Sequence, residues 1–144
     1  MIAEEQLPNQ DPSADNLERL ELEPFGWYSH PRIPYKIHYN LNCPESDSGE
    51  KGPPGEFMVT PDLNADGSGG ESLSIFVSES VPEEFKEVVF FHELREAELT
   101  FADGLDEPQA HAQAVVETEE YAKKFLPADQ FAKFLEWNLE VNLK

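Results

Sequence analysis

The chain has 144 residues, of which 39% are hydrophobic, and its 30 acidic and 10 basic side chains give a formal net charge of −20. This length suits one compact domain with a sizeable core. The charge argues against anionic partners, because it would repel nucleic-acid phosphates and anionic membrane surfaces. A peptide, a basic protein or a cation remains as a partner.

The first residues of the chain lack any hydrophobic pattern. Residues 1–16 are polar and acidic, which predicts a disordered tail followed by a single domain over residues 17–144. The start MIAEEQLPNQ has neither the basic region nor the apolar region of a signal peptide. Cys43 is the only cysteine, and no apolar run reaches membrane-spanning length. We therefore expect a cytoplasmic protein without an internal disulfide.

Three segments have the alternation of strands: residues 35–41, 56–60 and 72–78. Between the second and third, Asp62, Asn64 and Asp66 match the first half of a calcium-binding loop. The twelfth loop position, which needs a bidentate Glu, is Leu73. We therefore interpret this stretch as a turn between strands and not as a calcium site.

The second half of the chain has helical patterns. Ser80 and Glu83 have the spacing of a capping box, which predicts a helix that ends near Phe101. Asp106 then begins a second helix, and a third amphipathic helix is predicted over residues 128–143. Together the elements predict an α+β fold. We expect a small antiparallel or mixed sheet of about three strands, packed on a long central helix and two C-terminal helices.

The first helix carries the sequence HExxE at His92, Glu93 and Glu96. Helical spacing places His92 and Glu96 in the middle of one apolar face, while Phe90 and Leu94 belong to a second apolar stripe on the opposite side. A helix that is apolar on two sides is expected to be sandwiched. Polar groups at the centre of a buried face need a partner.

The second helix offers that partner in His111, on its inward face. A short connection makes the two helices an antiparallel hairpin, in which Glu96 and His111 differ in height by about 3 Å. Two imidazoles and a carboxylate form a common zinc ligand set, so we predict a metal site of His92, Glu96 and His111. The prediction requires the Phe90 stripe to face away from the second helix. The alternative is a buried His–Glu pair and a core histidine without metal.

The stretch SIFVSESVPEEFKEVVFFHELREAE resembles the zincin-like metallopeptidases, above all the small, minimal zinc peptidases. In that family a strand precedes a helix with HExxH, both histidines bind zinc, and the Glu between them activates water. The resemblance covers about residues 74–111 and implies zinc as cofactor. By position it makes His92 the first ligand, Glu93 the general base, Glu96 the second ligand and His111 a candidate third ligand. Glu96 replaces the family's second histidine, and its charge would reduce the Lewis acidity of the metal.

Two functions follow as hypotheses. The first is a zinc-dependent, metallopeptidase-like hydrolase, in which an edge strand at residues 72–78 aligns an extended peptide substrate by backbone pairing. The second is a non-catalytic binding or regulatory module with a zincin-like fold. In that case the His/Glu cluster is structural, and the acidic surface recognises a basic partner.

Overall fold

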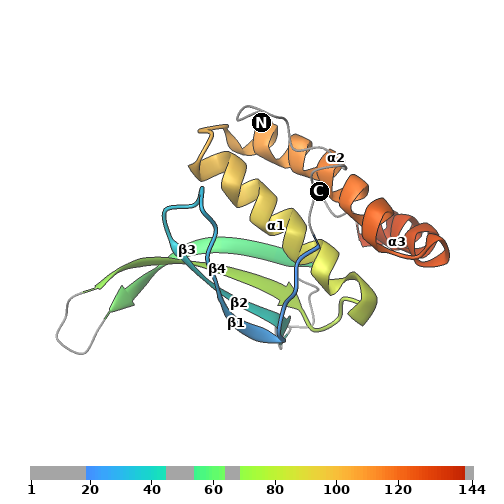
Figure 1. Ribbon diagram of the computed structural model, residues 1–144, viewed down its shortest axis with the longest axis horizontal. Coiled ribbons are helices and arrows are strands. Elements are labelled where there is room, and N and C mark those ends of the chain that lie inside the picture. The colour runs from blue at the N-terminus through green and yellow to red at the C-terminus, as the bar shows by residue number, and fades with distance from the viewer. Residues whose placement is uncertain (1–18, 45–53, 64–68, 142–144) are drawn as a thin grey trace, which may run out of the picture.

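The computed structural model describes residues 19–44, 54–63 and 69–141. The predicted disordered tail at residues 1–16 lies outside this range, as do Asn64 and Asp66 of the segment that resembles a calcium loop. The described residues form a sheet with helices on one of its faces (Figure 1). This arrangement confirms the predicted α+β fold.

The sheet is mixed and has four strands: β1 (Phe25–Tyr28), β2 (Lys36–Cys43), β3 (Gly55–Leu63) and β4 (Gly69–Ser78). The strand order is β1-β2-β4-β3, with β2 and β4 parallel and the other two pairs antiparallel. The expected count of about three strands therefore missed β1.

The expected edge position of residues 72–78 was wrong, because β4 lies between β2 and β3. Its inward side chains Leu73, Ile75 and Val77 are fully buried. A strand with this much apolar surface gains most from neighbours on both sides, since both its backbone edges and its apolar face then leave water. The edge strands of the described sheet are β1 and β3.

The helical half consists of a 3₁₀ turn, η2 (Glu83–Phe85), followed by α1 (Lys86–Phe101), α2 (Glu107–Phe125) and α3 (Ala128–Val141). The helix α1 packs directly on the sheet, and α2 lies antiparallel to α1 on the side away from the sheet (Figure 1). Within the described part of the chain, no helix combines the length and the apolar composition needed to cross a membrane.

The helix ends partly follow the sequence signals. The capping box of Ser80 and Glu83 does not form, because η2 begins after Pro82 and α1 begins after Phe85, both without a side-chain cap. The end of α1 at Phe101 is confirmed. Gly104, with φ +70°, then adopts the left-handed conformation that favours glycine after a helix. Asp106 caps α2, as predicted: its Oδ1 accepts a hydrogen bond from the backbone N–H of residue 109 at 2.9 Å.

The two apolar sides of α1 face different layers. Phe90 packs against the rings of Tyr28 and Tyr39 on the sheet, with ring centroids 5.9 and 5.2 Å away. His92 lies on the other side and contacts α2. The Phe90 stripe therefore faces the sheet, which is the orientation that the metal-site prediction requires.

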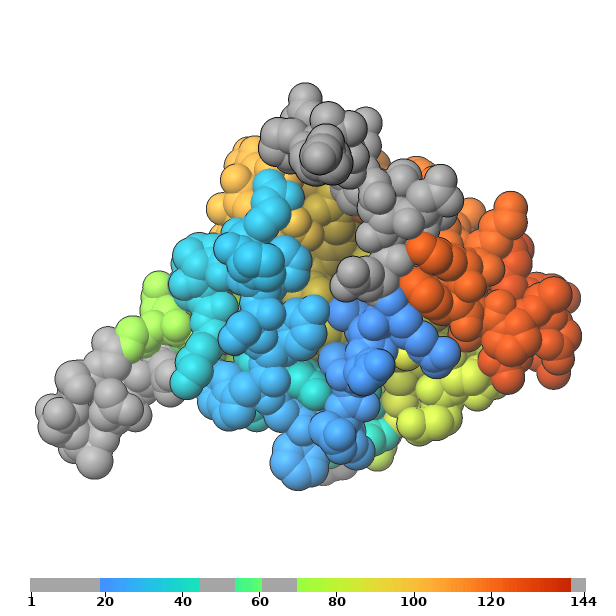
Figure 2. Space-filling view, in the orientation of Figure 1, coloured from blue at the N-terminus to red at the C-terminus, as the bar shows by residue number. Residues whose placement is uncertain are grey.

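The residues before β1 lie across the helices. The backbone N–H of Leu20 donates to the Tyr121 hydroxyl at 2.9 Å, and that of Glu23 donates to the Tyr39 hydroxyl at 3.1 Å. In the space-filling view these residues and β1 (blue) cover part of the body of the molecule, and α1 (gold) is visible behind them (Figure 2). The N-terminal part of the described chain thus ties the sheet to α2.

Candidate metal centre

His92, Glu96 and His111 converge between α1 and α2. Oε1 of Glu96 lies 3.4 Å from Nε2 of His92 and 3.3 Å from Nδ1 of His111. One ligand atom from each of the three side chains lies within 4.8 Å of the others. The three predicted ligands are therefore brought together.

The local sequence explains this meeting. His92 and Glu96 are one turn apart, so they project from the same side of α1. The left-handed residue Gly104 and the Asp106 cap keep the connection short, and α2 then returns along α1. The rings of His92 and His111 meet edge to face, with centroids 5.3 Å apart.

Thr118 completes the surroundings of His92. Its Oγ1 lies 3.2 Å from Nδ1 of His92, and its side chain is buried. A carboxylate only accepts hydrogen bonds, so Glu96 selects the His92 tautomer with the proton on Nε2, and Nδ1 then accepts from the Thr118 hydroxyl. With an ion on Nε2, the proton would instead lie on Nδ1 and be donated to Thr118 Oγ1, a contact of the kind that orients a metal-binding histidine.

The two histidines stabilise the ionised form of Glu96. Burial alone would raise the pKa of Glu96, but the hydrogen bonds from His92 and His111 outweigh it and hold this pKa below its ordinary value. Glu96 is therefore a carboxylate at neutral pH. An anionic oxygen between two imidazoles is suited to a cation.

Glu93 has a different environment. Only 6% of its surface is exposed, and it makes no hydrogen bond or ion pair with any described residue. Burial, followed by the charges of Glu96 and Glu56, raises the pKa of Glu93 to about 8. Gly55 of β3 lies directly against it: a Cβ at Gly55 would be 3.1 Å from Oε2 of Glu93 and 2.7 Å from Cγ1 of Val89. Glycine therefore permits the backbone of β3 to approach the carboxyl group.

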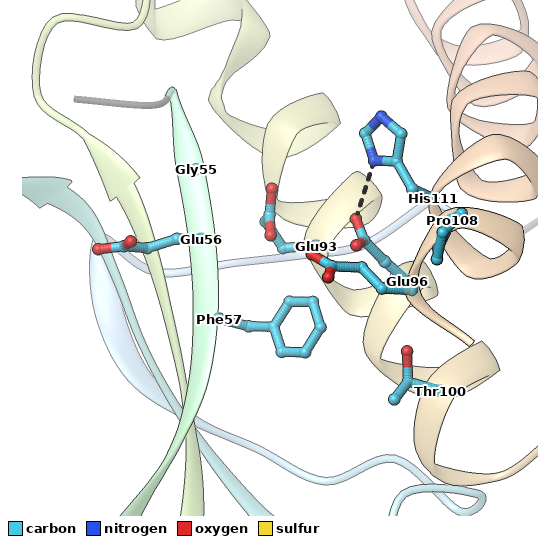
Figure 3. A pocket seen from close by; sticks show the side chains of 9 residues that line it. Gly55, Glu56, Phe57, Glu93, Glu96, Thr100, Pro108 and His111 are labelled. Atoms are coloured by element: carbon cyan, nitrogen blue, oxygen red, sulfur yellow. Dashed lines mark hydrogen bonds and ion pairs between the residues drawn. The ribbon is translucent and has the colours of Figure 1, made fainter. Parts of the chain in front are cut away.

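A pocket of about 740 Å³ opens beside the cluster, between β3 and the α1–α2 hairpin. Figure 3 shows the Phe57 ring directed from β3 towards the helices, and Glu93 and Glu96 directed from α1 into the space between them. The pocket is lined by Gly55, Glu56, Phe57, Glu93, Glu96, Thr100, Glu107, Pro108 and His111. Two of the three candidate ligands and the candidate base thus face one pocket, while His92 is buried behind them.

The chemistry of the donor set is compatible with a metal ion such as zinc, and the three ligand atoms all lie within 4.8 Å of one another. Two imidazole nitrogens and one carboxylate oxygen are ligands of catalytic zinc, and tetrahedral bonds of about 2.0–2.1 Å separate neighbouring ligand atoms by roughly 3.3–3.4 Å. The two separations at Glu96 Oε1 have these values. In addition, Nε2 of His111 is a buried ring nitrogen without a hydrogen-bond partner among the described residues.

The sequence patterns missed several parts of this region. Thr118 shares a face of α2 with His111, and this seven-residue spacing was a usable signal. The pocket wall from β3 gave no signal, because it depends on how the sheet lies against α1.

A buried ion pair beside the centre was also missed. Arg95 forms two hydrogen bonds to Glu117, with Nε to Oε1 at 2.7 Å and an Nη to Oε2 at 3.2 Å. Its other guanidinium nitrogen lies 2.9 Å from Glu98. This pairing explains why the carboxylate of Glu117 is buried.

Asp62 lies in β3, and the other two residues of the calcium-like pattern, Asn64 and Asp66, are outside the described residues. The cluster of His92, Glu96 and His111 is the candidate cation site that the described residues provide.

Comparisons with protein-family models, curated proteins and solved structures found no match to this chain. The functional argument therefore rests on the geometry of the centre.

Proposed function

We propose that this protein is a zinc-dependent hydrolase of the metallopeptidase type, with His92, Glu96 and His111 as ligands and Glu93 as general base. The observation that carries the proposal is the convergence of the three ligand atoms within 4.8 Å at the wall of a pocket that Glu93 also lines. A structural ion pair alone would not require a second, unpartnered carboxyl group at the same wall.

Each residue has a role in the proposed reaction. When bound, a zinc ion would supply a Lewis acid that polarises a substrate carbonyl and makes water easier to ionise. Glu93 would accept the proton of the attacking water, since no described residue competes for its carboxyl group. A nearby cation also favours the ionised form of Glu93, which a base requires. Thr118 would keep the His92 ring oriented.

The edge strand β3 supports a peptide as the substrate. Gly55, Glu56 and Phe57 form the pocket wall opposite Glu93, and the outer backbone edge of β3 is not paired with another described strand. An extended peptide can add to such an edge by backbone hydrogen bonds. This strand takes the place of residues 72–78, which the sequence suggested for the same purpose.

A non-catalytic binding module is the second candidate function. It is favoured by the contacts of Glu96 Oε1 with both imidazoles, because these satisfy the carboxylate without an ion. The cluster would then join α1 to α2, and the acidic surface would bind a basic partner.

Metal analysis separates the two candidates. Protein purified without an affinity tag is measured for zinc, iron, manganese and other transition metals, together with His92→Ala and the control His38→Ala. His38 is a suitable control because its ring lies 5.0 Å from that of Trp27, and because in β2 it alternates with the buried core residues Ile37 and Tyr39. We expect about one zinc per chain in the wild type and in the control, and none in His92→Ala. A wild-type protein without stoichiometric metal would contradict the metal centre.

Glu93→Gln then tests the chemistry. The substitution keeps the size of the side chain but removes its basicity. We expect peptide hydrolysis to fall by at least about a hundredfold while zinc affinity changes little. A metal-loaded wild type that cleaves no member of a mixed peptide library would favour the binding module.

A further inference from the structure

The pocket beside the candidate centre is strongly acidic. Glu93, Glu96 and Glu107 line it, and its described lining contains no Lys or Arg. Glu107 is exposed at the start of α2, whereas the other two carboxyl groups are buried in its wall. The charge of this pocket has the same sign as the formal charge of −20 of the whole chain.

Glu93 shows that this acidic wall is more than a solvated surface. Its side chain is 6% exposed, is directed into the pocket, and has no hydrogen bond or ion pair among the described residues (Figure 3). A largely buried carboxyl group that has no protein partner loses much of its hydration without a compensating hydrogen bond. A ligand with a positive charge or a hydrogen-bond donor would provide the missing partner.

A divalent cation would leave the pocket negative. It would offset the two formal charges of Glu96 and Glu107. Glu56, which also lines the pocket, adds a further charge of the same sign, although its side chain is directed away from Glu93 on the other side of β3 (Figure 3). The pocket therefore disfavours anionic groups, including the carboxylate of a peptide C-terminus.

The pocket also has apolar surface. Phe57 projects into it from β3, and Pro108 lies at its opposite wall on α2 (Figure 3). Lys and Arg side chains combine an aliphatic stem with a charged end, and such stems bury well against apolar groups. An aromatic face also attracts a cation directly.

We infer that the pocket selects peptides with a Lys or Arg side chain close to the bond that is cleaved. The inference rests on the proposed hydrolase for its reaction, but the recognition depends on the charge and shape of the pocket itself. The aliphatic stem lies against Phe57 and Pro108, and the charged end is placed near Glu107.

Peptide binding tests this selectivity without any catalysis. Amide chemical shifts of the full chain are followed as three capped alanine pentapeptides are added, with Lys, norleucine or Glu at the central position. Metal-free and zinc-loaded protein are both titrated. We expect the Lys peptide to bind most tightly, by about fivefold or more over norleucine, and the Glu peptide most weakly. The shifts should include Phe57 and Thr100.

A matched pair of variants locates the recognition. Glu107→Gln removes one charge that lines the pocket, while Glu119→Gln makes the same change at an exposed position of α2 outside it. Twelve helical residues separate the two, roughly 18 Å, which exceeds the screening length at physiological salt. The preference for Lys over norleucine should fall about two- to fivefold in Glu107→Gln and remain in Glu119→Gln.

The outcomes distinguish this inference from the proposed function. Equal binding of the three peptides, no binding of any of them, or an equal effect of both variants would overturn the selectivity, whether or not zinc is bound. A Lys preference in metal-free protein that binds no zinc would uphold the selectivity and contradict only the hydrolase. Cleavage after or before Lys or Arg in a peptide library would support both.

Discussion

Oε1 of Glu96 and Nδ1 of His111 lie 3.3 Å apart and join two helices across 15 positions of sequence. The same oxygen is 3.4 Å from Nε2 of His92, which lies one turn earlier on α1. One carboxylate oxygen therefore contacts an imidazole on each of the two helices. The position where a zincin-like peptidase has its second histidine is therefore occupied by the residue around which this cluster is built. Substitutions at these residues and at the neighbouring Glu93 can therefore test the cluster directly.

The first prediction concerns Thr118, whose hydroxyl contacts Nδ1 of His92. Thr118→Val keeps the shape but removes the hydrogen bond, so the ring is no longer held in one orientation. We expect the dissociation constant for zinc to rise by roughly 10- to 100-fold. Competition with a chromophoric chelator measures it. Thr118→Ser retains a hydroxyl and should restore most of the affinity; equal affinities of all three proteins would exclude this role.

The second prediction follows from the raised pKa of Glu93. Because this pKa is about 8 in the folded protein, the folded state holds a proton that the unfolded chain releases near the ordinary value of 4.5. The free energy of unfolding of metal-free protein should therefore fall as pH rises from about 4.5 to 8. Glu93→Gln removes this cost and should stabilise the protein by on the order of 2–4 kcal/mol above about pH 8, with little effect below about pH 5.

Urea denaturation in the presence of a chelator measures this difference at both ends of the range. Glu119→Gln serves as the control, since it removes a carboxylate from an exposed position. A gain in stability for Glu93→Gln that is the same at both pH values would show that the charge of Glu93 is not the cause.

The third prediction concerns Glu98, whose pKa is lowered, so that its contribution to stability changes with pH in the direction opposite to that of Glu93. Burial alone would raise the pKa of Glu98, but hydrogen bonds from His30 and Arg95 and the charge of Arg95 lower it to about 2. The stability that this carboxylate contributes is present above its ordinary pKa near 4.5 and is lost as pH falls towards 2. We expect Glu98→Gln to cost about 2–3 kcal/mol at neutral pH.

The cost of Glu98→Gln should shrink steadily below about pH 4.5, because the unfolded wild-type chain then takes up a proton that the folded state, with its pKa of about 2, does not. Paired urea titrations of wild type and variant across the acid range follow this convergence. If the two proteins keep the same difference in stability throughout, the ionised form of Glu98 contributes nothing.

The fourth prediction tests the close approach of β3 to Glu93. Gly55→Ala would place a methyl group 2.7 Å from Val89 and 3.1 Å from the Glu93 carboxyl, so either the strand or both side chains must move. We expect a loss of about 1–3 kcal/mol of stability from overpacking. Gly70→Ala is the matched control, because a Cβ there meets nothing within 4 Å. Thermal unfolding of both variants gives the comparison, and equal melting temperatures would rule out the crowding at Gly55.

Much of the helical half could be predicted from sequence because its determinants are local. The spacing of apolar residues identified two buried sides of α1, and Asp106 marked the start of α2 by a cap that depends on neighbours three residues away. Counting along a short hairpin then brought His111 to the height of Glu96. The capping box at Ser80 does not form, because the helical residues begin only after Pro82, two positions further along the chain.

The sheet and the pocket depended on contacts between distant parts of the chain. Alternation in residues 72–78 indicated a strand, but its interior place was decided by parallel pairing with β2 and antiparallel pairing with β3. Likewise, the burial of Glu117 against Arg95 depends on the packing of α2 on α1. A buried ion pair is stable only if the attraction between its partners offsets the cost of removing both charges from water, and the sequence does not show which residues will be partners.

The sequence by itself therefore determined which side chains share a helical face: His92 with Glu96 on α1, and His111 with Thr118 on α2. Helical geometry is periodic, so these relationships follow from spacing alone. Only the tertiary structure decided that the two faces meet, that Glu93 has no partner among the described residues, and that the edge strand β3 closes the pocket beside it. Those outcomes depend on how the apolar layers of sheet and helices pack, which is a property of the whole chain.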